Sequence, residues 1–140
     1  MEKHILALLG VVMLASLLLS GCQSQSAVVN DQSSKIQLDA HGLVKFVNSS
    51  LLQTTDKSKN VVSEKVSWMF ENIAGRTISI KIDIQFMDVA NHLLYNESKF
   101  LYYMNAGYKE QTFTPANYVT LSGVNAAKVD HVVIEVTEIK

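Results

Sequence analysis

The sequence predicts an all-β domain, an antiparallel sandwich of about seven strands. The clearest evidence is one stretch in which Ile78, Ile80, Ile82, Ile84 and Phe86 alternate with polar residues. A period of two indicates a strand with one buried and one solvated face, as in antiparallel sheets. Further short apolar segments follow one another at intervals of about 8–14 residues with turn residues between them, and no long helical pattern alternates with them. This arrangement favours two packed sheets over an α/β fold.

Three strands are expected before the isoleucine stretch. Ile36–Leu38 and Leu43–Val47 are short apolar segments on either side of a glycine. Asn48–Asn60 is expected to be a polar loop from which two leucines reach the core. Val61–Phe70 fits helical spacing as well as strand parity, but its β-branched and aromatic content favours a strand, with Trp68 in the core.

The chain after the isoleucine stretch is expected to continue as a β meander. Asp88–His92 has turn composition, and Leu93–Met104 is the next strand. Asn105–Gly107 is a candidate hairpin turn, after which Tyr108–Thr114 returns as a strand. Two last strands are expected, separated by a small-residue loop or single helical turn at Gly123–Asp130: Tyr118–Leu121 and His131–Ile139.

The N-terminus carries an export and anchoring signal. Ile5–Leu19 is an apolar run of about 15 residues, which suits a signal peptide and is short for a membrane span of about 20. It ends in Leu19-Ser20-Gly21-Cys22, which resembles the lipobox of bacterial lipoprotein precursors. This resemblance implies cleavage between Gly21 and Cys22 and lipidation of Cys22, the only cysteine in the chain. The alternative is an ordinary signal peptide followed by a chance cysteine.

These features divide the chain into a signal peptide at residues 1–21, the lipidated cysteine with a flexible tether at 22–35, and a β-sandwich at 36–140. The tether prediction rests on the polar composition of Gln23–Lys35, which has no aromatic residue and no strand or helix period. By resemblance to enterobacterial sorting signals, Gln23 after the cysteine favours the outer membrane.

Composition and motifs argue against several functions. Twelve basic and 13 acidic residues give a net charge of −1, which argues against nucleic acid or anionic lipid headgroups as the main partner, since both call for clustered Lys and Arg. His41, His92 and His131 lack the spacing of metal ligands, and no nucleophile or phosphate-binding motif is present. Asp88 is expected to cap its turn. We therefore expect no catalytic residue, metal or cofactor.

The aromatic residues near Asn105 are the most informative candidates for a contact surface. Strand parity places Tyr102 and Tyr103 on opposite faces, so at most one belongs to the core. Exposed tyrosines at the tip of a hairpin, here Tyr102, Tyr103 and Tyr108, would suit a partner contact. In the alternative arrangement Phe100 and Tyr102 pack inward, while Tyr103 and Tyr108 form a cross-strand pair.

The domain from Leu43 to Val136 resembles the YcfL-type family of small enterobacterial lipoproteins of unknown function. The resemblance is carried by Asn48–Leu52, by Phe70-Glu71-Asn72, by Ile84–Asn91 and by the C-terminal loop and strand; the sequence departs from it at Met87 and Asn91. It implies an immunoglobulin-like or transthyretin-like sandwich.

The lipobox and the lack of a catalytic motif together favour a non-enzymatic binding or accessory module. We expect it on the periplasmic side of the outer membrane, held there by its lipid. Its partner would be another envelope protein or the cell wall. The alternatives are a small envelope enzyme that acts on wall material through a carboxylate or histidine, and a surface-displayed lipoprotein of a mobile element involved in exclusion.

Overall fold

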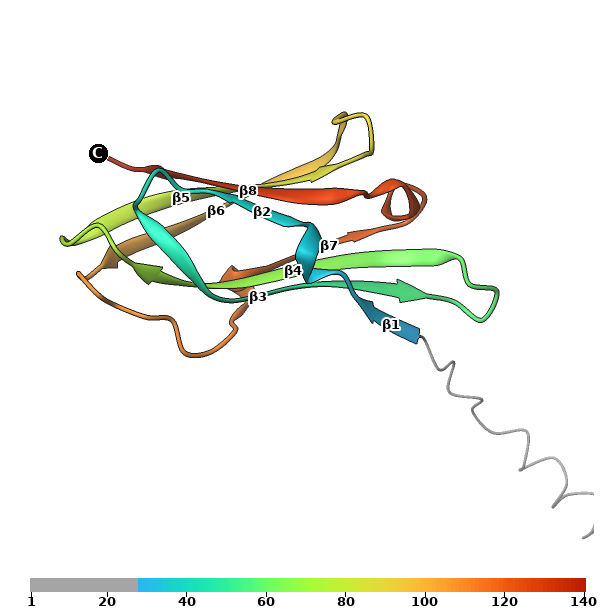
Figure 1. The fold of residues 1–140 in the computed structure, drawn as a ribbon, viewed down its shortest axis with the longest axis horizontal. Coiled ribbons are helices and arrows are strands. Elements are labelled where there is room, and N and C mark those ends of the chain that lie inside the picture. The colour runs from blue at the N-terminus through green and yellow to red at the C-terminus, as the bar shows by residue number, and fades with distance from the viewer. Residues whose placement is uncertain (1–27) are drawn as a thin grey trace, which may run out of the picture.

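Two four-stranded sheets pack face to face in the computed structural model, which describes residues 28–140 (Figure 1). One sheet has the order β1-β3-β4-β7 and the other the order β2-β8-β5-β6. The expected all-β sandwich is therefore confirmed, with eight strands in the described part of the chain. The expected signal peptide, Gly21 and Cys22 lie outside the described residues.

The strands are β1 (Val28–Asp31), β2 (Ile36–Asp39), β3 (Val44–Thr55), β4 (Val61–Asn72), β5 (Ile78–Met87), β6 (Leu93–Met104), β7 (Tyr118–Ser122) and β8 (His131–Glu138). Three short 3-10 helices connect them: η1 (Ser33–Lys35), η2 (Pro115–Asn117) and η3 (Ala126–Lys128).

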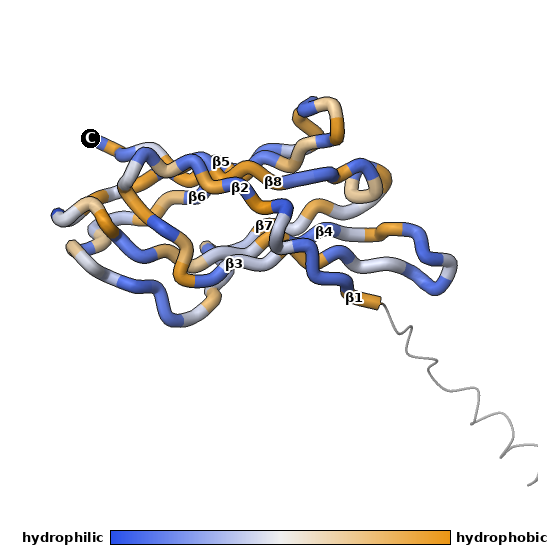
Figure 2. The backbone as a smooth tube through the Cα atoms, in the orientation of Figure 1, coloured by the Kyte–Doolittle hydropathy of each residue, from blue (hydrophilic) through white to orange (hydrophobic). Residues whose placement is uncertain are grey.

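β5 confirms the period-two prediction. Its residues alternate between buried and half-buried along the whole strand, and it lies between β8 and β6, in the interior of its sheet. Figure 2 shows apolar and polar residues alternating along the paired strands. The opposite sheet supplies Trp68 and Phe70 from β4, both fully buried as expected for Trp68. The isoleucine face of β5 and the aromatic residues of β4 thus form one core.

One strand pair departs from the expected antiparallel arrangement. β2 runs parallel to β8, with Ile36 opposite Val132 and Asp39 opposite Glu135, whereas the other pairs of described strands are antiparallel. The chain keeps its direction as it passes from β1 through η1 to β2, and β8 runs the same way. The chain crosses from one sheet to the other between β1 and β2 without reversing its direction, and β2 therefore lies parallel to β8.

The expected loop at residues 48–60 is wrong for most of its length, because β3 continues to Thr55. The polar side chains in this half of β3 bond to β4 across the sheet. Ser50 Oγ lies 2.6 Å from Ser67 Oγ, and Gln53 Nε2 donates to Glu64 Oε1 at 2.7 Å. The polar residues of this segment therefore belong to a strand and bond across the sheet. Only residues 56–60 form the turn between β3 and β4.

The expected flexible tether is also wrong for residues 28–35. β1 pairs with β3, and Gln32 N donates to the carbonyl oxygen of Leu51 at 2.7 Å. Ser33 begins η1, which carries the chain to the second sheet. All four residues of β1 are exposed, and the strand joins the edge of the sheet through backbone pairing with β3, so no burial period in the sequence indicated it. The sandwich therefore includes residues 28–35 as well as the expected 36–140.

A buried carboxyl group lies on the core-facing side of β4. Glu64 on β4 is 1% exposed, and its Oε2 has no hydrogen-bond partner among the described residues. Burial raises the pKa of Glu64 above its ordinary value, and this effect outweighs the hydrogen bond from Gln53 and the nearby charge of Lys35. Burial therefore makes ionisation of this group less favourable in the folded protein than in the unfolded chain.

We expect Glu64→Gln to increase stability at neutral pH by about 1 kcal/mol, because it removes a buried, incompletely bonded charge. A carboxyl with a raised pKa in the folded state stabilises the protein fully below its unfolded pKa. That stabilisation is lost as the pH rises through the folded pKa. Urea unfolding monitored by the fluorescence of Trp68, the only tryptophan, should show the difference growing from pH 4 to pH 7. A difference that is constant with pH would contradict this explanation.

The strand registers place the loops at two ends of the sandwich. Val28 at the start of β1 lies opposite Thr55, and Met87 lies opposite both Leu93 and His131. Residues 56–60, 88–92 and 123–130 therefore share the end at which β1 begins, which we call the β1 end. β6 runs away from it and finishes with Met104 at the opposite end (Figure 1).

Candidate interaction surface

Three aromatic side chains at the end of β6 form an exposed cluster. Phe100, Tyr102 and Tyr103 are 48%, 58% and 81% exposed. The ring centroids of Phe100 and Tyr102 lie 6.3 Å apart, and those of Tyr102 and Tyr103 lie 6.4 Å apart. We call these three residues the aromatic cluster. They contact one another while leaving much of their area to solvent.

A β-bulge produces the cluster. Ile80 pairs with Leu101 and Ile78 pairs with Met104, so β6 has one more residue than β5 between these pairs. The extra residue is accommodated at Tyr103, whose φ of 56° is left-handed and whose N–H donates to Ser79 Oγ at 3.1 Å. Both tyrosines are thereby exposed, and Met104 returns to the core.

Two expectations about β6 concern these residues. The expectation that at most one of Tyr102 and Tyr103 belongs to the core agrees with the structure, in which neither does. The alternative in which Phe100 and Tyr102 pack inward is wrong, because Phe100 lies opposite Lys81, on the face opposite to the isoleucines of β5. Leu101 is the residue that packs against the core from this part of β6.

Tyr108 does not belong to the cluster. Residues 108–114 do not form the expected returning strand; they make one isolated bridge, between Lys109 and Glu71 of β4. No ring contact among the described residues joins Tyr108 to Tyr103, so the hairpin and the cross-strand pair are both wrong. The chain instead crosses from one sheet to the other.

Glu110 explains why the chain crosses. Its buried carboxylate accepts a hydrogen bond from Phe70 N through Oε2 and from Asn117 Nδ2 through Oε1, both at 2.7 Å. Asn117 Oδ1 in turn accepts from Thr114 N and Oγ1. These bonds hold residues 110–117 against β4. The periodicity of the sequence did not indicate this contact.

The open edge of β6 is protected against pairing with another strand. Glu97 and Lys99 lie opposite Ile84 and Ile82, so they belong to the core-side face of this edge strand. They form an ion pair of 2.5 Å, and Tyr95 Oη donates to Glu97 at 2.9 Å. Lys99, followed by the bond from Tyr95, lowers the pKa of Glu97 despite partial burial. Inward-pointing charges and a β-bulge discourage another strand from pairing with this edge. A partner would therefore contact β6 through its side chains.

The sequence-predicted histidines form separate pairs with aspartates. His92 Nδ1 lies 3.1 Å from Asp88 Oδ2, and His131 Nδ1 lies 3.0 Å from Asp130 Oδ2. Asp88 Oδ1 also accepts from the N–H groups of Ala90 and His92 at 2.8 Å, and the His92 backbone bond is the main cause of its lowered pKa. Asp88 therefore caps its turn as expected.

His41, the third candidate, is far along the chain from these pairs and lies 3.4 Å from Asp39 at Oδ1. Among residues 28–140, no group of three or more His, Cys, Asp or Glu residues is placed to hold a metal ion. Within the same residues, no helix is long and apolar enough to cross a membrane.

Comparison with known proteins adds no assignment: no protein-family model, curated protein or solved structure matches this chain. The resemblance to YcfL-type lipoproteins therefore stays a prediction.

Proposed function

We propose that this chain is a lipid-anchored lipoprotein on the periplasmic side of the outer membrane, where its sandwich binds another envelope protein or the cell wall without catalysing a reaction. The observation that carries the binding role is the aromatic cluster on β6. The anchor and the location are supported by the lipobox, which ends at Cys22.

The aromatic cluster has the properties of a contact surface. Tyrosine and phenylalanine supply a large apolar area at a low cost in conformational entropy, and tyrosine adds a hydroxyl for polar contacts. A contiguous exposed aromatic patch is uncommon on proteins that act alone. The side chains of the aromatic cluster lie together at one end of β6, whose backbone edge is protected against pairing with another strand.

Backbone strain supports the same surface. The left-handed φ of Tyr103 is unfavourable for a side chain with a Cβ, at a cost of about 1–2 kcal/mol, and glycine would avoid it. Strained residues persist where the surrounding structure enforces them, and they are concentrated at functional positions. Tyr103 is 81% exposed, so its side chain does not stabilise the core.

The proposal predicts that Tyr102→Ala combined with Tyr103→Gly abolishes partner capture while the domain stays folded. Glycine removes the ring of Tyr103 and relieves its backbone, so the unfolding free energy should not fall because of that change. Two interface hot spots are worth about 2 kcal/mol or more each, so the yield of crosslinked partner should drop by at least about tenfold. Crosslinking in cells followed by mass spectrometry of the tagged full-length protein measures this yield.

The matched control is Tyr108→Ala, which removes a half-exposed tyrosine that lies outside the aromatic cluster. We expect it to leave the captured partners unchanged. Partners that survive in the double variant would rule out the cluster as the contact surface. Equal losses in the double variant and in Tyr108→Ala would indicate a nonspecific effect of removing aromatic area.

The two alternatives gain no supporting observation. The Asp88–His92 and Asp130–His131 pairs each consist of one acid and one base, and turn hydrogen bonds account for Asp88. Surface display makes a different experimental prediction from a periplasmic location. Protease treatment of intact cells would remove a displayed domain and would spare a periplasmic one.

A further inference from the structure

The β1 end of the sandwich carries two exposed valines on neighbouring loops. Val89 is 83% exposed and Val124 is 82% exposed, the highest values of any large apolar residue described. The loops that carry them are joined, since Asp130 N donates to the carbonyl oxygen of Met87 at 2.8 Å. Neither valine contributes to the core, so packing does not explain an apolar residue at either position.

The backbone holds both valines outward. Asp88 Oδ1 accepts from Ala90 N and His92 N, which closes the turn around Val89. Ala126 N donates to the carbonyl oxygen of Gly123 at 3.0 Å, which closes the turn around Val124. The two side chains are thus displayed by ordered turns at one end of the molecule.

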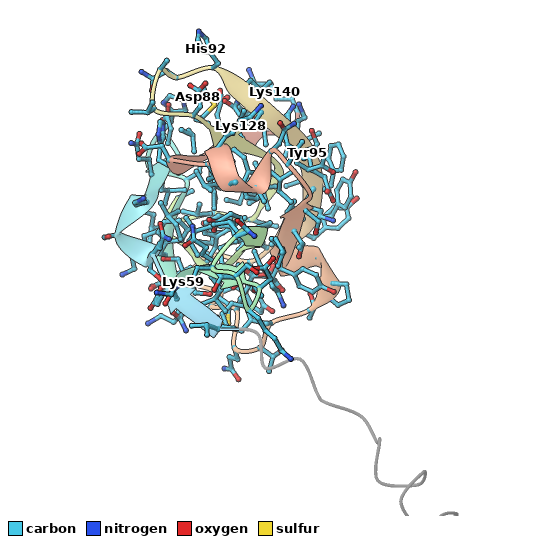
Figure 3. The ribbon with its side chains drawn as sticks, turned by 90° about the vertical axis from the view of Figure 1, so that its right-hand side faces the viewer. Lys59, Asp88, His92, Tyr95, Lys128 and Lys140 are labelled. Atoms are coloured by element: carbon cyan, nitrogen blue, oxygen red, sulfur yellow. The ribbon has the colours of Figure 1, made fainter. Side chains whose placement is uncertain are left out.

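Lysines surround this end. Lys57 and Lys59 lie in the β3–β4 turn, and Lys128 lies in η3, so the strand registers place all three at the β1 end; Figure 3 views the molecule from this end and labels Lys59 and Lys128. No ion pair among the described residues involves these three lysines. The neighbouring carboxylate of Asp56 instead accepts hydrogen bonds from Ser58 N and Asn60 N within its own turn.

An open hollow beside the β3–β4 turn extends the same surface. Its volume is about 600 Å³, and its lining includes Val28 and Asn30 of β1, Thr55 of β3 and the lysines Lys57 and Lys59. The hollow therefore combines the apolar side chain of Val28 with two lysines, and also with the Asp56 carboxylate, which is hydrogen-bonded within its own turn. This combination suits the acyl boundary and the phosphate of a phospholipid headgroup.

The position of the predicted anchor identifies the occupant. Cys22 precedes Val28 by six residues, which span at most about 21 Å when fully extended. A strand of 12 residues such as β3 or β4 spans about 40 Å. The β1 end is therefore held close to the bilayer, whereas the aromatic cluster lies toward the opposite end.

From this geometry we propose that the β1 end docks on the phospholipid surface, with Val89 and Val124 in the headgroup region and Lys57, Lys59 and Lys128 facing lipid phosphates. The inference rests on the proposed lipid anchor. Docking in this orientation directs the aromatic cluster away from the membrane, where a partner has access to it. The anchor then sets the orientation of the domain as well as its location.

Single-cysteine labelling tests this orientation, because lipidation blocks Cys22 and leaves an introduced cysteine as the only free thiol. Val124→Cys at the β1 end and Asn105→Cys at the opposite end are each labelled with an environment-sensitive fluorophore. The lipidated full-length proteins are reconstituted in vesicles of phosphatidylethanolamine and phosphatidylglycerol that contain a headgroup spin-labelled lipid. We expect quenching at residue 124 and none at residue 105.

Charge reversal at the docking surface gives a second readout. Lys57→Glu combined with Lys59→Glu should lower quenching at residue 124 at least about threefold, while Lys140→Glu at the opposite end should not change it. Proteins that fail to float with the vesicles would overturn the lipid anchor and this inference with it. Flotation without quenching at residue 124, or with equal quenching at both positions, would overturn the docking orientation alone.

Discussion

Replacing Asn72 with Asp is expected to destabilise the sandwich by about 3 kcal/mol or more, although it exchanges one amide nitrogen for an oxygen. Asn72 is 1% exposed at the end of β4. Its Nδ2 donates to the carbonyl oxygens of Arg76, Met104 and Asn105 at 2.8, 2.9 and 3.0 Å. Its Oδ1 accepts from Ala74 N at 2.9 Å. One buried amide thus joins the β4–β5 turn to the end of β6.

An ionised aspartate would reverse this bonding. It has no donor, so its second oxygen would face three carbonyl oxygens in a buried site, and those carbonyls would lose their partner. Both the turn after β4 and the exit from β6 would be affected. The loss is a large fraction of the 5–15 kcal/mol that typically stabilises a domain.

Unfolding in urea, monitored by Trp68 fluorescence, measures the effect. Burial should raise the pKa of the introduced carboxyl, so its protonated form, with one O–H donor, is favoured in the folded state. The deficit should therefore be smallest below its unfolded pKa of about 4 and should grow as the pH rises.

The matched control for this prediction is Asn105→Asp. Asn105 Oδ1 accepts from Thr77 Oγ1 at 3.2 Å on the surface, and an aspartate keeps that acceptor. We expect a change within about 0.5 kcal/mol. A similar loss in the two variants would mean that the buried donor of Asn72 is not the source of stability.

The sequence reveals the fold where a residue's burial follows from the local alternation of apolar and polar residues. The isoleucines of β5 needed no knowledge of their neighbours, because alternation alone decides which face is buried. β3 was divided wrongly because Asn48, Ser49 and Ser50 read as a loop, whereas cross-strand partners on β4 satisfy this segment. Such partners lie 17 or more residues away and leave no local signal.

The candidate surface was predicted only in part for the same reason. Tyr102 and Tyr103 are identifiable as aromatic residues near a turn, but their common exposure depends on a bulge opposite Ser79. Phe100 is exposed because its register places it opposite Lys81, and this pairing with β5 is not visible in the local sequence. Tyr108 was included because the chain was expected to turn back, whereas the buried Glu110 draws it toward β4. Long-range hydrogen bonds decided each of these outcomes.

The second large effect that we expect is the loss of lipidation when the thiol of Cys22 is removed. Cys22→Ala should abolish incorporation of labelled palmitate, because the chain has no other cysteine to acylate. One acyl chain gives marginal, reversible membrane binding, whereas two or more give stable attachment. Metabolic labelling and the mass of the purified protein measure the loss directly. Label that persists in the variant, or its absence from the wild type, would contradict the lipobox prediction.

This result also bears on the orientation of the domain. β1 begins six residues after Cys22 and is paired to β3, so a lipid on that cysteine is coupled to an ordered strand through a short segment. Loss of the lipid should therefore remove both attachment and orientation, while β1 and the core remain folded. If partner capture through the aromatic cluster then fails although the fold is intact, the lipid acts by placing the sandwich at the membrane. Capture that persists without the lipid would assign recognition to the sandwich alone.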